Sequence, residues 1–166
     1  MQASRRQFLR GEFSGRDIAL RPPWALRERE FAQRCTRCDA CNDACPTGII
    51  VRGQGGFPEV DFSRGECTFC GDCVRACEAG ALRYAAGAAR SVKAAIGTAC
   101  IALKQVVCRS CGDACDARAI RFKLRAGGVA VPELDTEACT GCGACHGACP
   151  VATIAMRQME DAVSAA

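Results

Sequence analysis

The sequence predicts a small α+β protein that consists of two tandem copies of one cysteine-rich unit, stabilised by bound metal more than by an apolar core. Three observations predict this fold. The chain has 166 residues, of which 16 are cysteines, a proportion typical of a disulfide scaffold or a metalloprotein. The cysteines fall into four groups of four along the chain. The groups recur at fixed offsets, which indicates that each half of the chain is one copy of the same unit.

The last group is the most regular of the four. Residues 139–150 read C-T-G-C-G-A-C-H-G-A-C-P, which is the C-x2-C-x2-C-x3-C-P spacing of bacterial [4Fe–4S] sites. Two intervening residues let a tight loop turn successive thiolates onto one small cube, and glycines in the gaps tolerate the positive φ of such turns. Pro150 then directs the chain away from the site, because its φ is fixed. We therefore predict a [4Fe–4S] cluster here, since neither disulfides nor zinc needs this spacing.

Two further groups, 35–45 and 67–77, have the same spacing and are predicted to hold clusters as well. The remaining group is irregular, because seven residues rather than two separate Cys100 from Cys108. A loop of that length still reaches one cube, so we predict a fourth cluster; the alternative is a degenerate site in which Cys100 is a buried free thiol. The predicted metal ligands are Cys35, Cys38, Cys41, Cys45, Cys67, Cys70, Cys73, Cys77, Cys100, Cys108, Cys111, Cys115, Cys139, Cys142, Cys145 and Cys149.

The two halves of the chain align as a repeat. The second group aligns with the fourth from its first cysteine to its last, and the last three cysteines of the first group align with those of the third. Two tandem bacterial-type two-cluster [4Fe–4S] ferredoxin-like units follow from this. In such units the fourth cysteine of one motif completes the other motif's cluster. Crossed pairing would therefore join Cys77 to the first group, Cys45 to the second, Cys149 to the third and Cys115 to the fourth; local grouping is the alternative.

The expected domains are a basic N-terminal arm at 1–34, a first unit at 35–85, a helical connector at 86–99, a second unit at 100–156 and a C-terminal tail at 157–166. The connector is expected because residues 85–96 are rich in alanine, whereas residues 57–62 alternate as a short strand does. Each unit is too short to bury a self-sufficient apolar core. We therefore expect bound clusters to stabilise the fold and to couple folding to iron loading.

The formal net charge of +4 lies entirely in the N-terminal arm, where eight arginines face four acidic residues. A neutral body with few aromatic residues argues against a nucleic-acid partner. No apolar run is long enough to span a membrane. Residues 4–10 look like the core of a twin-arginine export signal, but charged residues and glycines follow where an apolar region is needed. We therefore expect a cytoplasmic protein. Its arm is either a disordered basic segment or short amphipathic helix, or a segment that binds a partner.

Residues for ordinary catalysis are scarce. The one histidine, His146, lies between two cluster cysteines, where we expect a spacer. The sequence has no glycine-rich phosphate loop after a strand and no recognisable nucleophile–base pair. A cube held by four cysteines moves single electrons and has no open iron. We therefore expect no enzyme activity and name no catalytic residue. Trp24, the only tryptophan, either packs on its own domain or anchors a partner.

Four stretches resemble the NapF family, the ferredoxin-type accessory proteins of periplasmic nitrate reductase operons. They are S-R-R-x-x-L-R-G at 4–11, R-P-P-W at 21–24, C-T-R-C-D-A-C at 35–41 and the irregular group at 100–115. The resemblance implies a cytoplasmic iron–sulfur protein that meets the catalytic subunit of nitrate reductase, a NapA-type precursor, before its export. The implied role is maturation of that subunit, by insertion of its [4Fe–4S] cluster or by redox priming. The family is described with three regular motifs, which leaves the irregular group outside that description. The alternative role is a polyferredoxin that carries electrons to a reductase.

Overall fold

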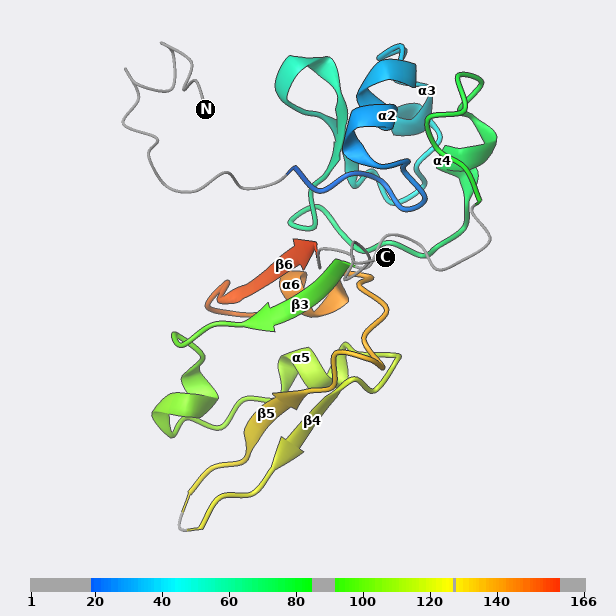
Figure 1. Cartoon of the computed structure of the whole chain (residues 1–166). Coiled ribbons are helices and arrows are strands. Elements are labelled where there is room, and N and C mark those ends of the chain that lie inside the picture. The colour runs from blue at the N-terminus through cyan, green and yellow to red at the C-terminus, as the bar shows by residue number, and fades with distance from the viewer. Residues whose placement is uncertain (1–18, 85–91, 127, 159–166) are drawn as a thin grey trace, which may run out of the picture.

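Each cysteine group folds into a loop that ends in one turn of helix. The computed structural model describes residues 19–84, 92–126 and 128–158, and Figure 1 shows them as two sets of short elements, one from each half of the chain. The four one-turn helices are α3 (Ala40–Asp43), α4 (Asp72–Arg75), α5 (Ser110–Asp113) and α6 (Ala144–Gly147). Within each half the two turns pack against each other, α3 on α4 and α5 on α6. The cysteine spacing therefore gives the same local structure four times.

A two-stranded antiparallel sheet lies between the two cysteine groups of each unit. In the first unit, β1 (Ile50–Arg52) pairs with β2 (Pro58–Val60) across the 3-10 turn η1 (Gln54–Gly56). In the second unit, β4 (Ile120–Lys123) pairs with β5 (Val131–Leu134). The short strand predicted within residues 57–62 is thus confirmed at its centre.

The second unit has another strand pair, which joins its two ends. Strand β3 (Val92–Ile96) runs antiparallel to β6 (Ile154–Gln158), with Ile96 opposite Ile154. The helix expected over residues 85–96 is therefore wrong for 92–96, while residues 85–91 lie outside the described ranges. Pairing with a distant strand overrides the helix propensity of alanine here. The second unit accordingly begins at Val92 rather than at Cys100, and its last strand extends to Gln158.

The first unit has a shorter counterpart of that strand pair. Ala25 bridges Leu82, and hydrogen bonds from Leu26 N–H to the Ala81 carbonyl (3.0 Å) and from Arg83 N–H to the Trp24 carbonyl (2.9 Å) flank the bridge. Helix α2 (Glu28–Arg34) follows. Residues 19–34, expected to form part of a separate basic arm, instead pack onto the first unit; residues 1–18 lie outside the described ranges.

The two units have separate small cores that differ in composition. The first core is built around Phe31, Ile49, Phe62 and Leu82. The second consists of Ala94, Ala119, Ile120 and Ile154 together with site cysteines. Residues Val92 and Met156, from β3 and β6, also pack against the first core, so this strand pair is the part of the second unit that faces the first (Figure 1).

None of the helices in the described ranges is long and apolar enough to cross a membrane.

Candidate iron–sulfur sites

The sixteen cysteines surround four separate spaces, with four thiols at each. We name them site 1 (Cys35, Cys38, Cys41 and Cys77), site 2 (Cys45, Cys67, Cys70 and Cys73), site 3 (Cys115, Cys139, Cys142 and Cys145) and site 4 (Cys100, Cys108, Cys111 and Cys149). All sixteen cysteines are free thiols. The thiols are therefore grouped as crossed pairing predicts, and local grouping is not observed.

The one-turn helices explain the crossed grouping. The third cysteine of each motif lies within a turn, as Cys41 does in α3, and the fourth follows four residues later, as Cys45 does. The third cysteine lines the site of its own motif, whereas the fourth lines the neighbouring site. Because the two turns of a unit pack together, each fourth thiol reaches across to the other motif.

The irregular group reaches its site through an additional turn. The 3-10 helix η2 (Ile101–Lys104) occupies most of the gap between Cys100 and Cys108. Gln105 then adopts the left-handed conformation, with φ of 64°, and reverses the chain. Cys100 thereby lines the same space as Cys108 and Cys111. The structure thus places Cys100 where a fourth ligand is needed.

One thiol at each site has a strongly raised pKa. Burial, reinforced by the charge of neighbouring thiolates, raises the pKa of Cys41 and Cys111 to about 11 and that of Cys73 and Cys145 to about 12. These four residues are the cysteines within the one-turn helices. At neutral pH each is a neutral thiol that becomes a ligand only when a bound cation compensates the thiolate charge. This donor chemistry fits a cationic iron–sulfur core.

Other groups at the sites donate hydrogen bonds to the cysteine sulfurs. A backbone N–H donates to the sulfur of Cys67 from Phe69 (3.4 Å), to that of Cys77 from Leu82 (3.4 Å) and to that of Cys115 from Ala119 (3.3 Å). At Cys67, burial outweighs this hydrogen bond and raises the pKa. The pKa of Cys38 is lowered, chiefly by a hydrogen bond from the backbone of Ala40. Burial by itself would raise the pKa of Cys45, but hydrogen bonds from Thr47 and the nearby backbone outweigh it, so that this pKa is also lowered. Such hydrogen bonds also tune the potential of a bound cluster.

Separated thiols around a shared space suit a polynuclear cluster better than a single ion. Across the described ranges, no three His, Cys, Asp or Glu side chains are placed to hold one metal ion. The ring of His146 is engaged elsewhere, because its Nδ1 lies 2.7 Å from the Ile154 carbonyl. The residues present therefore fit the [4Fe–4S] group that the motif spacing predicts.

Sites 2 and 3 meet at the boundary between the units. The N–H of Cys67 donates a 2.7 Å hydrogen bond to the carbonyl of Cys142. Beside it, the ring of Phe62 fills the space that a side chain at Gly143 would need, with a ring carbon 2.0 Å from the position of a Cβ atom. The motifs alone did not predict this junction, because Phe62 belongs to no motif and its contact is made with the other unit.

The fold and the four sites define a pair of tandem [4Fe–4S] dicluster domains. A family described as "4Fe-4S dicluster domain" matches residues 34–81 and 106–153. The chain is 42% identical over 154 residues to ferredoxin-type protein NapF of Escherichia coli K12, covering 93% of this chain and 94% of that protein. It is 46% identical over 166 residues to NapF of Haemophilus influenzae, covering 94% of each.

A more distant relative is the methylamine utilization ferredoxin-type protein MauM of Methylobacillus flagellatus. It is 33% identical over 158 residues, covering 83% of this chain and 67% of that protein. The chain belongs to the NapF family of ferredoxin-type proteins, which confirms the resemblance inferred from the motifs.

Proposed function

We propose that this protein holds four [4Fe–4S] clusters, one at each site, and acts in the cytoplasm as a maturation factor. Its partner would be the catalytic subunit of a periplasmic nitrate reductase, before export. The arrangement of sixteen thiols in four sets of four, in a chain of the NapF family, supports this proposal most directly. Each cluster, once bound, supplies one-electron chemistry, and the thiols supply the ligands.

The fourth cluster is the part of the proposal that rests on the irregular group. Its test is the iron content of Cys100→Ser, with Cys35→Ser as the matched variant, because Cys35 is the corresponding first cysteine in the first unit. Both variants should lose the iron of one site while the other three sites stay filled. Full iron in Cys100→Ser, together with loss in Cys35→Ser, would show that site 4 is not a cluster site held by Cys100.

The maturation role is tested on the partner rather than on this protein. Iron and molybdenum would be counted in the nitrate reductase catalytic subunit purified from cells with and without this protein. We expect the partner to lose the iron of one cluster when this protein is absent. A partner with full iron and a normal rate with an artificial electron donor would contradict maturation.

Electron transfer to a reductase is the second candidate function. The junction between Cys67 and Cys142 favours it, because the hydrogen bond joins a ligand of site 2 to a ligand of site 3. The partner measurement separates the two functions, since a carrier would leave the partner's iron complete and lower only its rate with the natural donor.

A docking role for the N-terminal arm requires a truncation that leaves the first unit intact. Removing residues 1–24 would delete Arg21 and Trp24, which pack onto that unit. Removing only residues 1–18 avoids this. We expect the shorter truncation to weaken partner binding while the cluster spectra stay unchanged; unchanged binding would assign docking to another surface.

A further inference from the structure

The segment 20–26 runs across the first unit and is bonded to it at both ends. At one end, the N–H of Val60 in β2 donates a 2.7 Å hydrogen bond to the Leu20 carbonyl. At the other, Ala25 bridges Leu82. In between, Ala25 N–H donates to the Pro22 carbonyl at 3.1 Å, which closes a tight turn at Pro23 and Trp24. The turn is therefore held in a fixed place.

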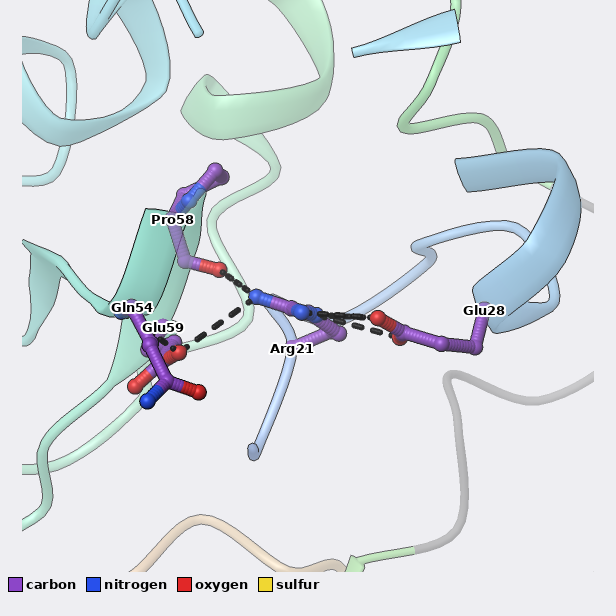
Figure 2. Close-up of polar contacts among 5 residues, drawn as sticks. All are labelled: Arg21, Glu28, Gln54, Pro58 and Glu59. Carbon is purple, nitrogen blue, oxygen red and sulfur yellow. Dashed lines mark hydrogen bonds and ion pairs between the residues drawn. The ribbon is translucent and has the colours of Figure 1, made fainter. Parts of the chain in front are cut away.

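The contacts of Arg21 hold the start of this turn in position. Its side chain is only 8% exposed, and Figure 2 shows it reaching Glu28 on one side and Pro58 and Glu59 on the other. The guanidinium donates to the Glu28 carboxylate at 2.7 Å and to the Pro58 carbonyl at 3.1 Å, and lies 3.6 Å from the Glu59 carboxylate. The two carboxylates compensate its charge, as a buried cation requires.

Two aromatic rings enclose the same guanidinium. Its central carbon lies 5.2 Å from the centre of the Phe31 ring and 5.4 Å from that of the Phe57 ring. A guanidinium within this distance of ring faces is attracted by the ring quadrupoles. Arg21 is thus bound to α2, to β2 and to both rings, and it fixes the residues that follow it.

Those residues cover site 2. Pro23 and Trp24 line the same space as Cys45, Cys67, Cys70 and Cys73. The Trp24 ring makes edge-on contacts with Phe69, at 6.3 Å between ring centres, and with Tyr84, at 5.1 Å. Phe69 lies in the loop between Cys67 and Cys70. The aromatic cluster therefore rests directly on the ligand loop of this site.

The corresponding position in the second unit has no such cover. When the second cysteine group is aligned with the fourth, Phe69 falls opposite Gly141 and Tyr84 opposite Met156. Ala25 bridges Leu82 as Ile96 pairs with Ile154, so that Ala95 takes the place of Trp24. Among the described residues that line site 3, none is aromatic. The cover formed by Pro23 and Trp24 at site 2 is therefore not repeated at site 3.

We propose that Pro23 and Trp24 form a cap over site 2, held in place by Arg21, that keeps water and chelators away from the iron bound there. The proposal rests on the occupancy of site 2 put forward above. An apolar shell around a metal site controls solvent access and local dielectric. Cover by a tryptophan therefore slows iron loss and disfavours the more negative, reduced form of the site, which lowers its potential. Trp24 acts here as a positioning and shielding residue.

The test compares Trp24→Ala and Trp24→Phe with Leu124→Ala, an exposed apolar residue of the second unit. Each anaerobically reconstituted protein is first assayed for iron per chain, and then mixed with an iron chelator while the loss of absorbance is followed. A redox titration monitored by electron paramagnetic resonance gives the potentials. The signal of site 2 is identified as the one missing from Cys73→Ser.

We expect Trp24→Ala to lose the iron of site 2 several-fold faster, with the other sites at the wild-type rate, and to raise the potential of site 2 alone. Trp24→Phe should restore most of the protection. Tyr84→Ala serves as a second test in case Trp24→Ala folds poorly. Tyr84 is half exposed and packs on Trp24, so its removal should give a smaller effect of the same kind.

Wild-type rates and potentials in Trp24→Ala and Tyr84→Ala would overturn the cap. Equal acceleration at all sites would also overturn it, because that result indicates general destabilisation. An empty site 2 in the wild-type protein would instead contradict the proposed function, and the initial iron assay detects this separately.

Discussion

The two units share one arrangement of thiols but differ in the residues that cover their sites and fill their cores. Each has two one-turn helices, one sheet between its cysteine groups and two crossed sites. Site 2 is covered by Trp24 from its own unit, whereas beside site 3 the ring of Phe62 comes from the other unit. Segments outside the cysteine motifs provide both contacts. Repetition of the motifs therefore reproduces ligand placement, while the environment of each site depends on residues that the repeat does not copy.

The cores show the same contrast. The first unit buries Phe31, Phe62 and Leu82, whereas the second relies on alanines, two isoleucines and its cysteines. A smaller buried apolar area contributes less to stability. The second unit should therefore depend on its clusters more than the first does.

Removal of iron should have the largest effect and should separate the two units. With a chelator under anaerobic conditions, we expect both units to lose structure, the second before the first, because its core is smaller. Far-ultraviolet circular dichroism reports on both units, and Trp24 fluorescence reports on the first alone. The dichroism should begin to fall before the fluorescence changes. Coincident transitions would show that the units unfold together.

Alanine substitution at two matched glycines should have the next largest effect. Gly143 and Gly71 both precede a one-turn helix with positive φ, 88° and 79°, so each substitution brings similar backbone strain. A Cβ at position 143 would overlap the ring of Phe62, whereas one at position 71 would meet the terminal hydroxyl of Tyr84, which is half exposed and can move. Gly143→Ala should therefore destabilise the protein by about 1–3 kcal/mol, as overpacking does, and Gly71→Ala by less.

Anaerobic urea unfolding of the iron-loaded proteins measures this difference. Gly143→Ala should also disturb the contact between the units, so the line shape of the reduced clusters in paramagnetic resonance should change. Equal destabilisation by the two substitutions would show that Phe62 moves aside at little energetic cost and that the contact between the units is not tightly packed there.

The pH dependence of iron loading should show the smallest difference between the units. Cys41, Cys73, Cys111 and Cys145 have a pKa of about 11 to 12, against an ordinary value of 9.0. Each must lose a proton to bind iron, so loading should fall as pH falls from about 8 to about 6. In the first unit the pKa of Cys38 and Cys45 is lowered, whereas burial raises that of Cys67, so the first unit should remain loaded to an only slightly lower pH.

Iron assays after reconstitution across this range measure the dependence, with Cys73→Ser and Cys145→Ser used to assign the loss to a unit. For metal-free protein that is still folded, pH affects stability in the opposite direction from iron loading. The contribution of these thiols to folding stability is fully present below pH 9, their ordinary pKa, and is lost as the pH rises toward 12. Loading that does not change with pH would contradict the assignment of these buried thiols as ligands.

The sequence predicts the grouping of the cysteines well because cysteine spacing is a local property. Two residues between cysteines produce the tight loop, and the four-residue step from Cys41 to Cys45 directs them to different sites. The alignment of the two halves then transfers the same reasoning to the second unit. The irregular position of Cys100 is accommodated by one 3-10 turn. The length of the loop showed that Cys100 could reach the site, but it did not predict this turn.

The domain boundaries were less predictable because they depend on pairing between distant segments. Residues 92–96 have the composition of a helix, yet they form a strand opposite 154–158. A signal was present in the repeat, since Leu82 and Ile154 occupy equivalent positions after the second and fourth cysteine groups and each needs a strand partner at the start of its unit. That reasoning would have assigned 24–26 to the first unit.

The cofactor class, the candidate ligands, the repeat and the family could all be predicted without a structure, because each follows from residue type and local spacing. How the sites are covered and how they meet became known only from the folded chain. Arg21 is fixed by two carboxylates and two rings from separate elements, and Cys67 contacts Cys142 across the unit boundary. Such contacts join residues far apart in the chain, and they arise from packing and burial, which no local pattern encodes.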